Sequence, residues 1–569
     1  MGERTVVGSA GPVGVHSTGV ADAVDTATKE PVRVEPAPTD PVDRDGSTPT
    51  LPPLGTDRPG PEPPAPARLR LGPPPPADRL RGWIVTLTLT LIAGAVRFVA
   101  LDRPTDGGTP VFDEKHYVPQ AWQMLRNGGV EDNPGYELVV HPPLGKQLIA
   151  LGELALGYNG WGWRAAAALA GTLCVLLVIR VARRLTGSTL LGGIAGVLLI
   201  CDGLSHVQSR MGMLDAFTAV FTLAAFATLV CDRDDVRARM ATVLAEGRIT
   251  ESPYGPRLGV RWWRLATGLL LGLGCAVKWS GVYWLVAFAA LTLLFDATAR
   301  RAAGVRRPWV GAMVRDLPPA AWALALLPVL VYVASWWGWF RSETAIDRHV
   351  VGWARGANGV GPDGMWSFVP DALRSLWFYS GHVLEFHAGL TTTSSGQHPW
   401  ESKPWTWPMA LRPMLYYYAS GEKVTGCGTA DCVSAVMLVG TPALWWPAIP
   451  VLAWALWRTV TRADWRYGAV LVGYAAGVLP WLANLDRQMY LFYMAPVAPF
   501  LVLATTLVMG EILGPASEGR ERRQTGLLVV SLWVGLVVAN FAWLWPILIG
   551  VPITSEAWDA QLWLPSWRA

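Results

Sequence analysis

Charged residues are scarce in this chain. Only 16% of its 569 residues are Asp, Glu, Lys or Arg, whereas 51% are hydrophobic, and the mean hydropathy is +0.29. This composition excludes a large soluble protein and predicts an all-α polytopic membrane protein. The net charge of +4 is small and no basic cluster is present, so we expect no nucleic acid as a partner.

Common catalytic signatures are also missing. The sequence has no Walker motif, dinucleotide-binding fingerprint, zinc-ligand spacing or serine nucleophile elbow, which removes the enzyme classes that depend on them. Cysteine is rare as well, and four of the six cysteines lie in or near apolar segments, where packing is their expected role. Cys427 and Cys432 share one loop, and the sequence leaves open whether they form a disulfide.

The first part of the chain is short of large apolar residues. Residues 1–80 are instead rich in Pro, Thr, Asp and Gly. Such a segment cannot bury enough apolar surface to offset its chain entropy. We therefore predict a disordered, Pro-rich cytoplasmic tail that acts as a tether or as a partner-binding arm.

Long apolar runs dominate the rest of the chain. They predict about eleven transmembrane helices in three regions: an N-terminal membrane region (81–340), an external loop rich in Trp and His (341–434), and a C-terminal four-helix membrane region (435–569). The candidate spans lie near residues 82–101, 161–181, 189–204, 213–230, 265–279, 281–295, 318–340, 435–457, 467–484, 491–510 and 527–550.

The distribution of arginine predicts the orientation. Arginine-rich segments recur on one set of loops, at 180–184, 233–264, 300–315, 458–466 and 520–523. By the positive-inside rule these loops and the N-terminal tail are cytoplasmic, and the C-terminus lies outside. The opposite face carries two longer loops, 102–160 and 341–434, and five of the few lysines: Lys115, Lys146, Lys278, Lys403 and Lys423. We place the chemistry of the protein on this external face.

A pair of adjacent carboxylates follows the first apolar segment. Asp113 and Glu114 lie in the stretch VFDEKHY, residues 111–117, and charges at the mouth of a membrane span are costly unless they serve a function. Neighbouring residues on a helix point about 100° apart, so one carboxylate would face the reacting group while the other fixes a neighbouring element. The alternatives are a solvated loop pair and an acidic helix N-terminus.

A second motif, HPPLGK, occupies residues 141–146 of the same external loop. Its prolines hold the backbone extended ahead of a helix. The short apolar run that follows predicts an amphipathic helix at the membrane surface. The alternative is a simple helix start with an exposed Lys146.

Four cations lie at the external ends of predicted spans: Arg164, Arg210, Lys278 and Arg487. Each alone could extend harmlessly to the membrane interface. Together they suit an anionic lipid headgroup such as a polyprenyl phosphate.

The external stretch 398–409 reads HPWESKPWTWPM and is dense in Trp and Pro. Its first residues, His398 and Trp400, could belong to a platform that stacks on a sugar or binds an acceptor. The alternative is an aromatic belt at the membrane interface.

The order of these motifs resembles the protein O-mannosyltransferase family of the GT-C glycosyltransferase superfamily. The matching features are the Asp-Glu pair, HPPLGK, the Arg-x4-Asp turn at 210–215, KWSG at 278–281, the 398–409 loop and RQMYLFYMAP at 487–496. The resemblance covers residues 82–569 and is strongest to the bacterial polyprenyl-phosphate-mannose–protein mannosyltransferases. The external loop 341–434 is too short for the β-trefoil domain of the eukaryotic relatives, and the N-terminal tail lies outside the family pattern.

The resemblance implies a GT-C membrane enzyme that moves mannose from polyprenyl-phosphate-mannose to Ser or Thr hydroxyls of exported proteins, on the outer face of the cell membrane. The reaction would be a single inverting displacement. By family matching Asp113 is the base, and Glu114 orients the site or binds the acceptor. The other matched residues are the donor-phosphate ligands Lys278, Arg164, Arg210 and Arg487, and the site-shaping residues His141 and Lys146. Cations suffice for the departing phosphate, so no metal is required and a divalent metal is left open. The secretion machinery is a further candidate partner.

Two other readings stay open at this stage. The first is a GT-C enzyme that uses the same kind of lipid-phosphate donor but a lipid or cell-wall glycan acceptor. Single residues do not identify the acceptor. A lipid or solute transporter belongs to a different class and predicts charges at the bilayer midplane and two repeated halves. The sequence shows neither feature clearly.

Overall fold

The computed structural model describes residues 78–131, 140–351, 368–515 and 519–568. The predicted N-terminal tail, 1–80, therefore lies almost wholly outside the described residues. Helices make up most of the described chain, which confirms the predicted helical class.

Within the described residues, six helical segments are long and apolar enough to cross a membrane. They are α1 (Arg79–Phe98), α4 (Gly160–Thr186), α7 (Asp215–Ala245), α9 (Gly281–Ala302), the run Pro308–Ser335 and α20 (Arg520–Ile549). The run contains α10 (Pro308–Gly311), α11 (Leu317–Ala321) and α12 (Leu327–Ser335). The other predicted spans fall on shorter helices: α5 (Thr189–Ile200), α8 (Trp262–Val277), α17 (Ala448–Arg462), α18 (Trp465–Val478) and α19 (Ala498–Leu513). The number of spans therefore stays a prediction.

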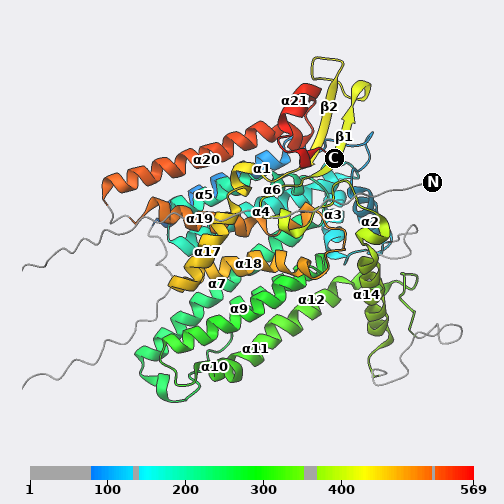
Figure 1. Cartoon of the computed structure of the whole chain (residues 1–569). Helices are drawn as coiled ribbons and strands as arrows, with labels where there is room; N and C mark the ends of the chain where they lie inside the picture. The colour runs from blue at the N-terminus through cyan, green and yellow to red at the C-terminus, as the bar shows by residue number, and fades with distance from the viewer. Residues whose placement is uncertain (1–77, 132–139, 352–367, 516–518, 569) are drawn as a thin grey trace, which may run out of the picture. The chain divides into compact units, whose positions relative to one another are not determined.

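The long helices run side by side (Figure 1). One end carries α2 (Glu114–Arg126), α3 (Leu144–Leu156) and α14 (Asp371–Gly389). Helix α10, which directly follows an arginine-rich loop, lies at the opposite end. The carboxylate pair and this arginine-rich loop are thus separated along the helices, as the two-faced sequence pattern predicts. Helix α14 runs across the direction of the long helices (Figure 1).

A small antiparallel sheet was not predicted. It contains β1 (Met414–Ser420), β2 (Cys432–Leu438) and β3 (Ile553–Thr554), in the order β1-β2-β3. The predicted span 435–457 is wrong at its start, because its first residues belong to β2 and the long helix begins only at α17. Every residue of β2 is buried, and a fully buried strand has the same continuous apolar pattern as a buried helix segment. Cys427 and Cys432 form a disulfide across the β1–β2 connection.

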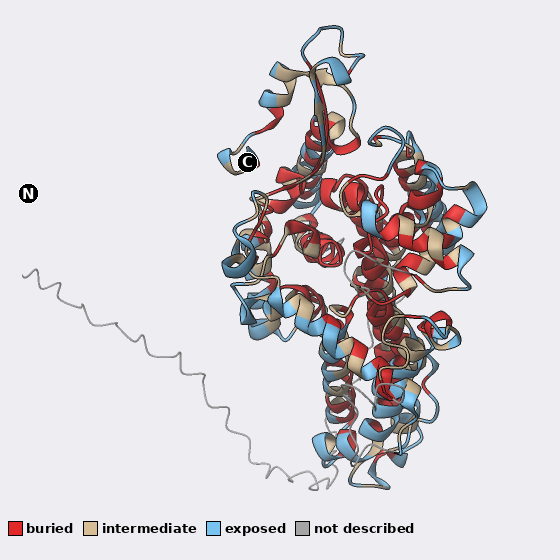
Figure 2. Ribbon diagram, turned by 90° about the vertical axis from the view of Figure 1, so that its right-hand side faces the viewer, coloured by how far each residue is buried: buried red, intermediate tan, exposed pale blue. Residues whose placement is uncertain are grey.

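Buried residues concentrate in the middle of the helices, and exposed ones lie at the periphery (Figure 2). Large apolar side chains are nevertheless exposed on the outer helices, for example Leu91 on α1 and Leu532 on α20. Such residues suit contact with lipid. At the arginine-rich end, the buried guanidinium of Arg261 binds both Asp232 and Asp296 and so joins α7 to α9.

Candidate active site

Asp113 lies where the first external loop turns into α2. The residue before it, Phe112, adopts a left-handed backbone conformation with φ +52°. The Asp113 side chain is half-buried, and burial raises its pKa to about 6, against the opposing effect of Lys278 and His116. At neutral pH the carboxylate is therefore ionised, with a pKa close enough to the working pH for it to accept a proton.

Glu114 is fully buried and faces a different partner. Its two oxygens accept hydrogen bonds from Nε and Nη2 of Arg164, each at 2.7 Å. The backbone amides of Gly212 and Val111 donate to the same carboxylate at 2.6 and 3.2 Å. Since four donors saturate these oxygens, the geometry favours a structural role for Glu114 over contact with an acceptor.

The guanidinium groups of two predicted phosphate ligands, Arg164 and Arg210, form hydrogen bonds within the protein. Besides Glu114, Arg164 donates to the carbonyls of Leu101 and Pro104 at 3.0 and 2.8 Å, and it has no exposed surface. Arg210 donates to the carbonyls of three residues at the end of α1: Arg97, Val99 and Ala100. These contacts stabilise the segment that follows α1, and phosphate binding by Arg164 and Arg210 stays a prediction. An arginine that donates to carbonyls has the same sequence signature as one that binds a phosphate.

Lys278 lies beside the candidate base. Its ammonium group is 3.0 Å from both carboxylate oxygens of Asp215, the first residue of α7. The rings of Phe492 and Tyr493 lie 5.5 and 5.7 Å from the same nitrogen. Both Lys278 and Asp215 act electrostatically on Asp113. Asp215 was not predicted as a site residue, although it closes the Arg-x4-Asp turn.

Arg487 approaches a pair of stacked histidines. The rings of His141 and His387 are 5.3 Å apart and nearly parallel. His387 donates from Nε2 to the carbonyl of Val140 at 2.9 Å, which leaves Nδ1 to accept from Arg487 at 3.5 Å. Burial, together with nearby Arg487 and Lys278, lowers the pKa of His387 to about 4, and the pKa of His141 falls well below its usual value for similar reasons. Both rings are therefore neutral at pH 7.

Arg487 also donates to the carbonyl of His387. No carboxylate among the described residues forms an ion pair with this guanidinium. It is therefore a cation that can take an anionic ligand without first losing a carboxylate partner. His387 itself was not predicted, because it lies far along the chain from the motifs and only the fold brings α14 to this site.

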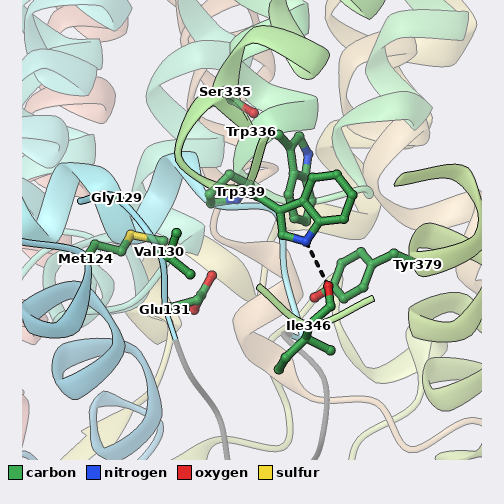
Figure 3. A pocket seen from close by; sticks show the side chains of 10 residues that line it. Met124, Gly129, Val130, Glu131, Ser335, Trp336, Trp339, Ile346 and Tyr379 are labelled. Atoms are coloured by element: carbon green, nitrogen blue, oxygen red, sulfur yellow. Dashed lines mark hydrogen bonds between the residues drawn. The ribbon is translucent and has the colours of Figure 1, made fainter. Parts of the chain in front are cut away.

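Lys146 is paired inside the protein. Its ammonium group binds the carboxylate of Glu131, and both side chains are buried. An aromatic pocket lies beside this pair, lined by Glu131, Trp336, Trp339 and Tyr379 among others (Figure 3). Trp339 donates from its ring nitrogen to the carbonyl of Ile346 at 2.8 Å, which fixes one wall (Figure 3). The pocket brings Glu131, which follows α2, close to Tyr379 of α14. The site-shaping role of Lys146 stays a prediction.

The predicted platform residues lie in a loop that is held against the Arg487 segment. His398 accepts from the backbone amide of Trp400 at 3.1 Å, and its ring meets that of Tyr490 edge-on at 5.4 Å. Lys403 donates to the carbonyls of Leu485 and Arg487 at 2.7 and 3.1 Å. Trp400 is half-buried and packs against the main core, which limits the ring surface it offers to a sugar.

Within the described part of the chain, no three His, Cys, Asp or Glu side chains come together as metal ligands would. Lys278 interacts with both nearby carboxylates: it forms an ion pair with Asp215, and its charge lowers the pKa of Asp113. The described residues thus place a cation of the protein itself within electrostatic reach of Asp113.

Comparison with known proteins identifies the family. Residues 87–344 match the family model described as dolichyl-phosphate-mannose-protein mannosyltransferase. Residues 372–567 match the C-terminal four-transmembrane region of protein O-mannosyltransferase. The chain belongs to the protein O-mannosyltransferase family.

Curated relatives cover nearly the same span. The chain is 58% identical over 491 residues to a Mycobacterium tuberculosis protein named polyprenol-phosphate-mannose–protein mannosyltransferase, covering 86% of this chain and 93% of the relative. It is 42% identical to the Corynebacterium glutamicum protein of the same name, covering 85% and 93%. Among solved structures, the Saccharomyces cerevisiae protein O-mannosyltransferase Pmt1-Pmt2 complex bound to the sugar donor matches with a TM-score of 0.64 and 15% identity, covering 86% of this chain and 93% of that one. This structural match supports the GT-C fold.

Proposed function

We propose that this protein transfers mannose from polyprenyl-phosphate-mannose to Ser or Thr hydroxyls of exported proteins. The observation that carries the proposal is the half-buried carboxylate of Asp113, with its raised pKa, beside the Lys278–Asp215 pair. A base and a cation at one place are what attack by a hydroxyl and departure of a phosphate require. The names of relatives 58% and 42% identical supply the donor and acceptor classes.

The reaction proceeds as one displacement. The acceptor hydroxyl gives its proton to a carboxylate oxygen of Asp113 as the oxygen attacks the anomeric carbon of mannose. The bond from that carbon to the phosphate oxygen breaks, and polyprenyl phosphate leaves with the electron pair. The anomeric configuration inverts, and no covalent sugar–enzyme intermediate is needed.

Two groups are proposed for the departing phosphate. Lys278 supplies one positive charge. Its ammonium group lies 3.0 Å from both carboxylate oxygens of Asp215, and this contact holds the lysine near Asp113. Arg487 supplies the second, because no carboxylate among the described residues pairs with its guanidinium, whose side-chain neighbours are the neutral ring of His387 and the ring of Trp481. Because His141 and His387 stay neutral, they do not repel Arg487, and the positive charge near the phosphate comes from Lys278 and Arg487.

The acceptor side is proposed to involve the loop 398–409 and the floor built by His141 and Lys146. His398 and Trp400 lie in that loop, beside the Arg487 segment. The site would face the outside of the cell membrane together with the C-terminus, while the N-terminal tail would be cytoplasmic. The secretion machinery is the proposed source of the acceptors.

The test uses membranes from cells that express the wild type, Asp113→Asn or Asp106→Asn. Asp106 is the matched control, since it lies in the same loop but is exposed and pairs only loosely with Lys115 at 3.8 Å. Radiolabelled polyprenyl-phosphate-mannose is added with a peptide rich in Ser and Thr, and the label is counted in the peptide, lipid and glycan fractions. We expect peptide label with the wild type and Asp106→Asn and none with Asp113→Asn. Label in only the lipid or glycan fraction would show that the acceptor is a lipid or a glycan and not a protein.

A further inference from the structure

The backbone just ahead of the candidate base is strained. Phe112 has φ +52°, a region that is unfavourable for a residue with a side chain unless its surroundings hold it there. The Phe112 ring stacks on Tyr416, with centroids 4.2 Å apart and planes 14° from parallel. It also meets the edge of Phe492 at 6.4 Å. The aromatic contacts therefore hold the conformation that introduces Asp113.

Tyr416 reaches this stack because β1 contains an irregularity. Leu415 pairs with Met437 and Tyr417 pairs with Val436, so Tyr416 is the extra residue of a β-bulge. Bulges redirect a side chain and are frequent next to active sites. Tyr416 is 4% exposed, whereas Tyr418 of the same strand is 49% exposed.

The far end of the tyrosine is fixed as well. The side-chain amide of Gln208 donates to the Tyr416 hydroxyl at 2.8 Å. Gln208 is buried at the end of the short helix α6 (Gly203–Gln208), which lies between the membrane helices α5 and α7 in the chain. The ring is thus held at its hydroxyl by the N-terminal membrane region while its face supports Phe112.

We propose that Tyr416 is a positioning residue for Asp113: its ring holds Phe112 in the left-handed conformation and so sets the direction of the Asp113 carboxylate. The inference rests on the proposed role of Asp113 as base. It assigns a task to the C-terminal region, because β1 lies in the segment 372–567 while the base lies in the segment 87–344. In this proposal the Asp113 carboxylate is held in position only when the two regions pack together.

The surroundings define what the stack does to the carboxylate. The charged groups that act on Asp113 include Lys278, His116 and Asp215. Three tyrosines, Tyr117, Tyr416 and Tyr490, also lie within electrostatic reach of Asp113. Burial is the largest cause of the raised pKa of Asp113. Removing the tyrosine ring would admit water, free the backbone at Phe112 and weaken this effect.

The test compares three variants over a range of donor concentrations up to saturation, so that kcat and the donor KM are both measured. Tyr416→Leu removes the stack, Tyr416→Phe keeps the ring and loses only the bond to Gln208, and Tyr418→Leu is the matched control on the same strand. We expect Tyr416→Leu to lower kcat by about 10- to 100-fold, since a misplacement of about 1 Å has an effect of this size, with the donor KM changed less than about twofold. Tyr416→Phe should stay within about threefold of the wild type, and Tyr418→Leu should equal it.

Two further readouts separate positioning from a general loss of structure. The acidic limb of the pH profile of kcat/KM should move to lower pH in Tyr416→Leu, because Asp113 becomes better hydrated. The double variant Phe112→Leu/Tyr416→Leu should lose no more activity than either single variant, since both break one stack. If Tyr416→Leu does not fold, Phe112→Leu carries the same predictions.

The outcomes distinguish this proposal from the proposed function. Wild-type kcat and an unmoved pH limb in Tyr416→Leu, with Asp113→Asn inactive, would overturn the positioning role and leave the base in place. Full activity of Asp113→Asn would overturn the base assignment and the positioning role together. A loss in Tyr416→Leu that appears only in the donor KM would also contradict positioning and indicate a binding role.

Discussion

The pH dependence of transfer is set by the surroundings of Asp113. Only the ionised carboxylate accepts a proton, and burial raises its pKa to about 6. The active fraction is therefore about 90% at pH 7, about half at pH 6 and about a tenth at pH 5. The value of kcat/KM should rise with pH through this range and level off above pH 7.

The charge of Lys278 also affects the pH at which Asp113 ionises. Its positive charge lowers the pKa of Asp113 against the effect of burial. Replacing it in Lys278→Met removes that charge, so the acidic limb should move to higher pH, while kcat also falls because the departing phosphate loses a cation.

The assay is the initial rate of peptide labelling at subsaturating donor, from pH 4.5 to 8, in membranes of the wild type and of Lys278→Met. Preincubation at each pH followed by assay at pH 7 controls for irreversible inactivation. A wild-type profile that is flat between pH 5 and 7 would refute the base assignment. A limb that moves to lower pH in Lys278→Met would refute the electrostatic account of the site.

The remaining predictions concern the frame and the anion site. Glu114→Gln should lower the melting temperature in detergent, because breaking a buried ion pair costs about 3–5 kcal/mol. Combining Glu114→Gln with Arg164→Met should recover part of that loss. An inactive Glu114→Gln with the wild-type melting temperature would indicate that Glu114 contacts substrate instead. Arg487→Gln should raise the KM for donor by about tenfold or more, given the 1.5–3 kcal/mol of a charged hydrogen bond, and leave the melting temperature unchanged; an unchanged KM would remove it from the phosphate site. Lys146→Met should lower the melting temperature more than Lys146→Met combined with Glu131→Leu, and equal values would show that their buried pairing is unimportant.

Much of the fold follows from the sequence. Apolar runs locate the membrane helices, and alternation of arginine separates the two ends of the molecule. The motif at 141–146 predicts the helix that begins at Leu144, and α3 confirms it. The run at 432–438 could not be assigned, since a fully buried strand and a buried helix look alike over seven residues.

The candidate site was only partly predictable, for a physical reason. Adjacent charges such as Asp113 and Glu114 can be recognised, but a sequence does not show which side chain turns to solvent and which is saturated by buried donors. Arg164 and Arg487 look alike in sequence, yet one is paired with Glu114 and the other approaches neutral His387. Long-range partners of this kind depend on packing between segments that are hundreds of residues apart.

The central claim is that Asp113 acts as the base of mannosyl transfer to a hydroxyl. The most direct measurement is the single-turnover rate of peptide labelling by purified Asp113→Asn, at a donor concentration where bound polyprenyl-phosphate-mannose has been measured. We expect donor binding within about twofold of the wild type and a labelling rate lower by at least about 100-fold, which is within the range for loss of a general base. Equal binding with a labelling rate near that of the wild type would contradict the account.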